Sequence, residues 1–375
     1  MSSSTEFIPV NTPLMRGNEK KYLEQCIDSG WVSSEGPFVA QFEEKFSARV
    51  QRNHGISVTN GTAALELAIA ALELSKGDEV IMPAFTIISC AQAITRAGAV
   101  PVLVDAEPVT WNMDVAAIEE KITPRTKAIM AVHIYGLPVD MDPLLEIAAR
   151  YNLMVIEDAA EAIGLDYKER PCGSMGDISI FSFYANKHVS CGEGGMVCVN
   201  DPKLAERCRS LRNLCFSSRR FVHKELGWNM RMTNLQAAVA LAQLEQLDDF
   251  VLRKQRMGQR YRERLMGLDT ITTAPASTTY ADNGYWVFGI VLDEDLPFDA
   301  TDVMTELGKR KIGSRPFFWP MHHQPVFQNM SLFVEEHHPV SEKIARLGFY
   351  PPSGLSLDND QIDRVSVALI EIIRC

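Results

Sequence analysis

The sequence predicts an α/β protein in which a large domain, with a mostly parallel mixed sheet flanked by helices, precedes a smaller C-terminal α/β domain. Short apolar runs alternate with helical stretches from about residue 55 to residue 200, and these runs are apolar on both faces. Strands of this kind are typical of parallel sheets that helices cover on both sides. The chain is 375 residues long, which is more than one small core usually serves, so two domains are expected.

The elements of the first half follow from these runs. The expected strands are Ile56–Val58, Glu79–Met82, Val100–Val104, Ala128–His133, Met154–Glu157, Ile178–Phe183 and Met196–Val199. The helical patterns between them are Thr62–Leu74, Val115–Lys121, Met141–Tyr151 and Pro202–Leu211.

A second region follows a strong helix start at Thr233. Thr233 stands three residues before Gln236, which is the spacing of a capping box, and apolar residues then recur at helical spacing. From about residue 270 the elements are less dense, with the apolar segment YWVFGIVL and a polar helix near 301–310. We therefore predict a large domain over residues 1–245 and a small domain over residues 246–375.

Composition and charge exclude several classes of protein. Hydrophobic residues make up 46% of the chain and charged residues 23%, as in ordinary globular proteins. The net charge of −11 argues against a nucleic-acid partner, because phosphate binding needs clustered lysine and arginine. No apolar run approaches the roughly 20 residues that span a bilayer, and the N-terminus lacks the pattern of a secretory signal. A cytoplasmic protein without nucleic-acid or membrane partners is expected.

The eight cysteines are scattered and form no C-x-x-C pair. Zinc sites and disulfide frameworks need closer and more regular spacing. We therefore predict no metal site, and expect free thiols in a reducing compartment.

Three segments carry chemistry, and the first is Asn60-Gly61-Thr62 between a strand and a helix. The N-terminus of a helix exposes unpaired N–H groups that can bind a phosphate, and Gly61 lets the backbone approach closely. Alone, the segment is better explained as a glycine turn with a threonine cap. No G-x-G-x-x-G or Walker sequence is present, so a dinucleotide or triphosphate site has no support.

The second segment ends a strand with Asp158. Ligands of open α/β sheets bind at the carboxyl ends of strands, and a carboxylate there can keep a pyridine nitrogen protonated. A cap for the following helix explains Asp158 equally well.

The third segment delivers Ser182 and then Lys187 after a strand and before a glycine-rich turn. A lysine among apolar residues can have a lowered pKa and attack a carbonyl to form an imine. A solvated surface lysine is the better interpretation of Lys187 alone. The order of the three segments, a phosphate cup, a strand-end Asp and a Lys near a Ser, reverses that preference.

These segments resemble the DegT/DnrJ/EryC1/StrS family of sugar aminotransferases, which have the aspartate-aminotransferase fold (fold type I). The resemblance extends over nearly the whole chain, from GNEKKYLEQCIDSGWVSSEGPFVAQFE through VHIYG, EDAAEAIG, SFYANK, GEGGM and GWNMRMTNLQAA to RPFFWPMH. It implies pyridoxal 5'-phosphate as the cofactor. L-glutamate would donate the amino group, leaving 2-oxoglutarate, and a nucleotide-linked keto-sugar would accept it.

The resemblance also implies roles for single residues. Lys187 would form the Schiff base with the cofactor and move the proton in both half-reactions. Asn229 would reach the cofactor phosphate of a partner subunit, so a homodimer with a shared active site is expected. The other cofactor contacts are implied at Gly61, Thr62, Ala63, Asp158, Glu161 and Ser182.

Two positions depart from the family pattern. Ile87 stands where many members have an aromatic residue that stacks on the cofactor ring, so either Ile87 packs there or Phe85 does, which the spacing makes the weaker choice. Met230 stands where many members have a tyrosine.

The substrate is a finer inference from the resemblance. The most similar members aminate C4 of GDP-linked 4-keto-6-deoxymannose, and an enzyme for a UDP-linked 4-keto or 3-keto sugar is the alternative. The expected substrate contacts are Trp31, Ser33, His133, Tyr135, Arg231, Arg315 and His322. Considered without the resemblance, Arg315 is as well explained by a surface ion pair and His133 by packing.

Lys187 also separates this chain from relatives of a different activity. A branch of the family that removes a sugar hydroxyl has histidine at this position, so lysine favours amination. The neighbouring His188 is best explained as a residue that faces away. A catalytically silent regulatory protein of the same fold is the alternative from another class, and the intact Lys187, Asp158 and Ser182 argue against it.

Overall fold

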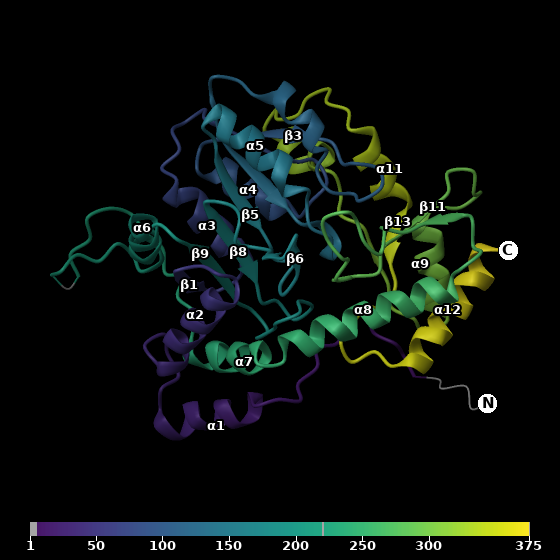
Figure 1. Cartoon of the computed structure of the whole chain (residues 1–375), viewed down its shortest axis with the longest axis horizontal. Helices are drawn as coiled ribbons and strands as arrows, with labels where there is room; N and C mark the ends of the chain where they lie inside the picture. The colour runs from purple at the N-terminus through teal and green to yellow at the C-terminus, as the bar shows by residue number, and fades with distance from the viewer. Residues whose placement is uncertain (1–5, 220, 375) are drawn as a thin grey trace.

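The larger sheet of the protein has seven strands in the order β1-β9-β8-β5-β4-β2-β3 (Figure 1). The computed structural model describes residues 6–219 and 221–374. Strands β2, β3, β4, β5 and β8 run parallel, and β9 is antiparallel to its neighbours β1 and β8. The predicted mostly parallel mixed sheet is confirmed. The strands are β1 (His54–Val58), β2 (Glu79–Pro83), β3 (Val100–Val104), β4 (Thr126–Val132), β5 (Met154–Asp158), β8 (Ile178–Ser182) and β9 (Gly195–Val199).

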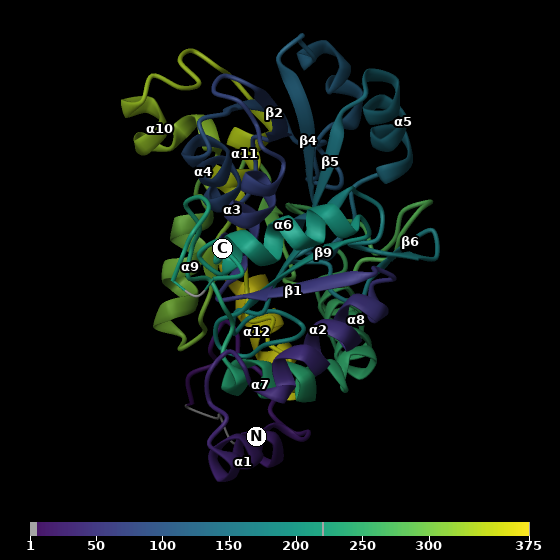
Figure 2. The same ribbon diagram turned by 90° about the vertical axis from the view of Figure 1, so that its left-hand side faces the viewer.

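Helices cover both faces of this sheet because its central strands are apolar on both. In β8, Ile178 and Ile180 pack into one hydrophobic cluster with α3, whereas Phe181 packs into another with α2 and α7. The helices of this part are α1 (Glu19–Ser29), α2 (Pro37–Arg49), α3 (Gly61–Ala71), α4 (Ile88–Arg96), α5 (Met141–Tyr151), α6 (Pro202–Arg212) and α7 (Asn234–Leu244). Figure 2 shows α1, α2 and α7 together, away from α3 and α4.

The predicted helix over Val115–Lys121 is wrong. The segment forms two short 3-10 turns, η1 (Val115–Ala117) and η2 (Glu119–Lys121), and the Asp114 side chain caps the first. Ile118 is the only fully buried residue of the segment, so no apolar face supports a longer helix. The smaller elements nearby are η3 (Ile134–Gly136) and a hairpin of β6 (Asp166–Tyr167) and β7 (Arg170–Pro171).

The long helix α8 (Leu247–Arg264) links the larger sheet to a second, four-stranded sheet (Figure 1). The predicted capping box at Thr233 is confirmed at the start of α7, and Glu245 and Gln246 separate α7 from α8. The second sheet is antiparallel, in the order β10-β11-β13-β12. The strands and helices of this second part of the chain are β10 (Ile271–Thr272), β11 (Ile290–Leu292), α9 (Ala300–Lys309), β12 (Arg315–Pro316), η4 (Met321–His323), α10 (Pro325–Asn329), α11 (Pro339–Leu347), β13 (Gly348–Tyr350) and α12 (Asn359–Ile373).

One hydrophobic cluster joins residues of both sheets, so the two parts share a core. The segment before α1 also crosses between them, since Ile8 pairs with Ile312 beside the second sheet. The domain boundary near residue 245 stays a prediction. Over the described residues, no helix has the length and apolar character needed to cross a bilayer, and the seven cysteines there are all free.

Candidate functional site

A cavity of about 700 Å³ lies at the carboxyl ends of the parallel strands of the larger sheet. Asp158 ends β5, Ser182 ends β8, and Lys187 follows β8 in a turn. Because carboxyl ends of parallel strands meet at one edge of the sheet, these side chains come together there. The second sheet closes the opposite wall with Arg315, Phe318 and Tyr350.

The Lys187 side chain is the amine of this cavity, and only 10% of it is exposed. Its Nζ lies 3.5 Å from Glu161 Oε1 and 3.9 Å from the centre of the Trp286 ring. Burial lowers the pKa of Lys187, while the carboxylates of Glu161 and Asp158 oppose that shift. The Trp286 indole is held in place because its Nε1 donates a hydrogen bond to Asn186 O at 2.9 Å.

Glu161 connects Lys187 to the wall of the cavity. Its Oε2 accepts a hydrogen bond from Tyr135 N at 2.9 Å. The Tyr135 hydroxyl in turn accepts one from Phe318 N at 3.0 Å. Burial raises the pKa of Glu161 to about 7, although the nearby Lys187 opposes the shift. Glu161 can therefore gain or lose a proton near neutral pH.

Asp158 is a buried carboxylate that accepts few hydrogen bonds. Its Oδ1 accepts from Ala160 N at 3.1 Å, and its Oδ2 from the Cys90 thiol at 3.5 Å. Burial raises the pKa of Asp158, and within residues 6–219 and 221–374 no lysine or arginine forms an ion pair with it. The free acceptor capacity of this carboxylate suits a cationic N–H group in the cavity, such as a protonated pyridine nitrogen.

The N-terminus of α3 meets the end of β8 at the other side of the cavity. A Cβ on Gly61 would lie 2.7 Å from Ser182 Cβ, so only glycine permits this approach. The N–H groups at the start of α3 and the Ser182 hydroxyl can bind an anion. Ala63 N already donates to Asn60 Oδ1 at 2.8 Å, so this N–H is not free for a phosphate as the structure stands.

The structure brings most of the expected cofactor residues together. Ile87 is 40% exposed at the start of α4 and lines the cavity, whereas Phe85 is fully buried against Tyr135 and Phe317. Of the two candidates for the ring-stacking position, only Ile87 faces the cavity. The cavity is lined by the predicted residues Gly61, Thr62, Ala63, Ile87, Asp158, Glu161, Ser182, Lys187 and Arg315.

The expectation that His133 lines the pocket is wrong. Its ring is fully buried, with Nε2 3.1 Å from Glu157 Oε1 and with Nδ1 accepting a hydrogen bond from Val139 N. Val132 pairs with Asp158 in register, and their side chains lie on one face of the sheet. The residues directly adjacent to them, His133 after Val132 and Glu157 before Asp158, face the other side. His133 therefore shares a face with Glu157 and not with Asp158.

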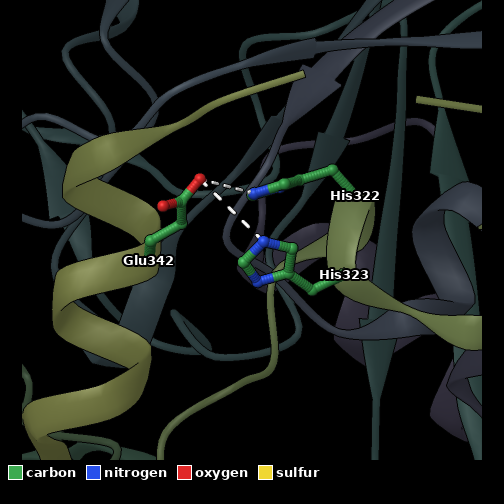
Figure 3. A group of neighbouring side chains, drawn as sticks. All are labelled: His322, His323 and Glu342. Carbon is green, nitrogen blue, oxygen red and sulfur yellow. Dashed lines mark hydrogen bonds and ion pairs between the residues drawn. The ribbon is translucent and has the colours of Figure 1, made fainter. Parts of the chain in front are cut away.

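His322 is likewise turned away from the cavity. Its ring is 1% exposed and its Nε2 lies 2.9 Å from Glu342 Oε1 on α11 (Figure 3). Since η4 points this ring at α11, His322 is not among the residues that line the cavity, and its predicted contact with the substrate stays a prediction. Tyr135 is also buried, and it packs beneath the cavity wall against Phe317 and Phe318.

Four predicted residues lie outside the cavity lining, either at the surface or in contact with other parts of the chain. Trp31 and Ser33 are exposed beside α1 and α2, where Asn234 N donates to Ser33 O. Asn229 is exposed, and Arg231 Nη1 donates to Asn213 Oδ1 at 2.6 Å. That Asn229 reaches into a partner's site stays a prediction. His188 is buried with Nδ1 3.1 Å from Ile163 O, and burial lowers its pKa to about 3, as expected of a residue that faces away.

The sequence interpretation missed several cavity residues. Trp286 lies in the apolar segment YWVFGIVL, of which only Ile290–Leu292 forms a strand. The aromatic residues of this segment were the available signal. The other unpredicted residues of the lining include Ser89, Tyr184, Asn186, Phe318 and Tyr350.

Comparisons with known proteins agree with this site. The DegT/DnrJ/EryC1/StrS aminotransferase family matches residues 13–370. The chain is 41% identical to the GDP-perosamine synthase of Caulobacter vibrioides over 98% of both chains, and 40% identical to that of Escherichia coli O157:H7 over 95% of this chain and 96% of the other. Among solved structures, it is similar to DesV of S. venezuelae, with a TM-score of 0.88, 34% identity and coverage of 96% and 95% of the two chains.

The matched segment includes every strand of the larger sheet and the whole Lys187 cavity. The fold, the position of the lysine and the match over almost the full length lead to one conclusion: this chain belongs to the DegT/DnrJ/EryC1/StrS aminotransferase family.

Proposed function

We propose that this chain transfers the amino group of L-glutamate to the C4 keto group of GDP-4-keto-6-deoxymannose. The chain belongs to the DegT/DnrJ/EryC1/StrS family, whose aminotransferases use pyridoxal phosphate. The GDP-sugar is supported by full-length similarity to enzymes named GDP-perosamine synthase, at 38–41% identity. The observation that carries the catalytic role is the buried amine of Lys187 between Glu161 and Trp286.

The residues of the cavity fit pyridoxal phosphate. Bound there, the cofactor supplies an aldehyde that captures amines and a protonated ring that withdraws electrons from the bond being broken. Asp158 would hold the ring nitrogen protonated, since its carboxylate has acceptor capacity left. Gly61, Thr62 and Ser182 would bind the phosphate, and Ile87 would pack on the face of the ring.

Lys187 moves the protons of the reaction in this proposal. Burial lowers the pKa of its Nζ, so the amine is easily deprotonated and takes the α-proton of glutamate. The same Nζ later delivers a proton to C4 of the sugar. Glu161 stabilises the charged form of Lys187 between these events, and the Trp286 ring restricts where its Nζ can point and keeps water away.

The sugar nucleotide would enter past Arg315. This guanidinium is exposed at the wall of the cavity, and its fork matches the oxygens of a diphosphate. The rings of Tyr184, Phe318 and Tyr350 line the same opening and offer surfaces on which a sugar can pack.

A second subunit would complete the site. The segment between α6 and α7 extends away from the body of the chain (Figure 1), and exposed Asn229 lies near its end. We therefore propose a homodimer in which the partner's Asn229 reaches the cofactor phosphate.

Product analysis tests this function. The purified protein, loaded with pyridoxal phosphate, is incubated with glutamate and a panel of GDP- and UDP-linked 4-keto sugars, and the products are identified by mass spectrometry. The expected result is an amino sugar only from the GDP-linked substrate, with 2-oxoglutarate formed in equal amount. Amination of UDP-linked sugars alone would refute the GDP assignment and leave the class of reaction standing.

A further inference from the structure

Four histidines from two distant segments surround Glu342, outside the Lys187 cavity. His322 and His323 belong to η4, and His337 and His338 directly precede α11, which carries Glu342 in its first turn. Figure 3 shows the His322 and His323 side chains pointing from η4 toward the carboxylate of Glu342. The proposed aminotransferase reaction uses none of these groups.

The distances within this histidine cluster are close to those of a metal site. Glu342 Oε1 lies 2.9 Å from His322 Nε2, 4.0 Å from His323 Nε2 and 3.7 Å from His337 Nδ1. Ligands at about 2.0–2.1 Å from a tetrahedral zinc ion are about 3.3 Å apart. Small side-chain shifts are therefore enough to place an ion among them, and His337, whose side chain is 83% exposed, has the most freedom to move.

The electrostatics of the cluster suit a divalent cation better than several protons. The His322 and His323 rings are 4.1 Å apart between centroids, so two imidazolium charges there would repel each other. The Nε2 atoms of both rings lie on the side of Glu342 Oε1, where a cation would be shared.

Two further features describe the surroundings of these side chains. The Nδ1 atom of buried His322 has no hydrogen-bond partner among the described residues, so the hydrogen bonds of this ring are incomplete. Outside the three ligand positions, His338 Nε2 lies 2.9 Å from Glu336 Oε2, which fixes the chain just before α11. From the same segment His338 N donates a hydrogen bond to Glu342 Oε1 at 3.1 Å, and such second partners commonly orient the ligands of metal sites.

We propose that His322, His323 and Glu342 bind a divalent transition metal ion, best matched by zinc, with His337 as a fourth and mobile ligand. Imidazole nitrogens together with one carboxylate are a typical zinc donor set. The ion would tie η4 to α11. This matters for the neighbouring cavity, because Met321 N donates to Ala84 O at 2.9 Å and Phe318 lines the cavity wall. The site braces that wall and takes no part in the amino transfer.

The test measures zinc binding by the full-length chain after treatment with a chelator. Isothermal titration with zinc is compared for the wild type, for the double variant His323→Ala/His337→Ala, and for the control His223→Ala, which removes an exposed histidine outside the cluster. His337 is exposed and His323 is only half-buried, so folding is expected to survive both substitutions. Wild type and control should bind one zinc ion per chain. The affinity of the double variant for zinc should be lower by about tenfold or more.

Cobalt gives an independent readout of the same site. In the wild type, added Co²⁺ should produce the visible absorption of a tetrahedral ion with nitrogen and oxygen ligands, and zinc should raise the melting temperature. Both effects should be lost in the double variant and kept in His223→Ala. Equal zinc affinity in all three proteins, or a cobalt spectrum typical of thiolate ligands, would overturn the proposal, because the ion would then bind elsewhere, for example at cysteines.

Discussion

Lys187 Nζ lies 3.9 Å from the centre of the Trp286 ring, although the two residues come from opposite halves of the sequence. A cation over an aromatic face is stabilised by about 0.5–2 kcal/mol, more when it is shielded from water. The ring thus favours the ammonium that Lys187 becomes each time it takes up a proton. The larger sheet supplies the amine, and the second part of the chain supplies the surface that positions it.

Replacing Trp286 tests this relationship. We expect Trp286→Leu to lower kcat about tenfold, because it removes the ring, which corresponds to about 1.4 kcal/mol of transition-state stabilisation. Trp286→Phe keeps a ring but loses the hydrogen bond to Asn186 O, and should lower kcat much less. Steady-state kinetics of the two variants show whether the aromatic ring or the hydrogen bond to Asn186 O matters for kcat. Equal losses in both would mean that the hydrogen bond matters and the ring does not.

Asp158 should act through its charge. Asp158→Asn keeps the size of the side chain and removes the partner of a buried cation, a loss of about 3–5 kcal/mol. The expected fall in kcat is therefore on the order of 10²–10⁴-fold. Circular dichroism checks that the fold is retained. Near-normal kcat in Asp158→Asn would show that this carboxylate does not hold the cofactor ring.

Gly61 is expected to set the affinity for the cofactor phosphate. Gly61→Ala places a Cβ 2.7 Å from Ser182 Cβ, which forces the start of α3 away from the end of β8. We expect cofactor binding about tenfold or more weaker, measured by fluorescence titration of the apoprotein, a loss of about 1.4 kcal/mol or more.

Gly308 in α9 is the matched control for that substitution. A Cβ at Gly308 meets nothing within 4 Å. Gly308→Ala should leave cofactor affinity unchanged and stabilise the fold by about 0.5–1 kcal/mol, as alanine does within a helix. Similar weakening in both variants would refute the proposed phosphate cup.

The buried Lys254 should make the stability of the folded chain depend on pH. It is buried in α8, where its Nζ donates to Trp286 O at 2.8 Å and to Ser353 O. Burial lowers the pKa of Lys254 from 10.5 to about 7. Between these two values the unfolded chain holds a proton on this amine that the folded chain lacks. The free energy of unfolding contributed by Lys254 therefore rises with pH between about 7 and 10.5, and is constant below that window.

Lys254→Met should abolish this dependence. In apoprotein unfolded by urea, the stability of the wild type relative to Lys254→Met should increase from pH 7.5 to pH 9.5, by at most about 1.4 kcal/mol per pH unit. The exposed Lys20, replaced by methionine in the same way, is the control and should show no such trend. If the difference in free energy of unfolding between the wild type and Lys254→Met did not change with pH, Lys254 would keep its proton in the folded chain.

The sequence predicts well those site residues that lie at the end of a strand or shortly after it. Asp158, Ser182 and Lys187 all follow or end apolar strands, and the parallel sheet brings such residues to one edge. Periodicity alone does not tell which of two adjacent residues faces the cavity. His133 was misplaced for this reason, because it follows β4 on the face that it shares with Glu157.

Contacts between distant parts of the chain could not be predicted from local patterns. Trp286 precedes a short strand, and nothing in its neighbourhood indicates that its ring covers Lys187. His322 stands in a family-like segment, but its direction is set by Glu342 on α11, which only the packing of η4 against that helix determines. Over Val115–Lys121 the helical pattern was present, yet too little of it is buried to support a helix.

The central claim is that Lys187 is the residue that bonds to the cofactor, and one labelling measurement tests it directly. The protein loaded with pyridoxal phosphate is reduced with borohydride, digested and mapped by mass spectrometry. The mass of the reduced cofactor should appear on the peptide that contains Lys187, and prior incubation with glutamate should prevent the labelling. Labelling of the other buried lysine, Lys254, or of no lysine at all would contradict the account.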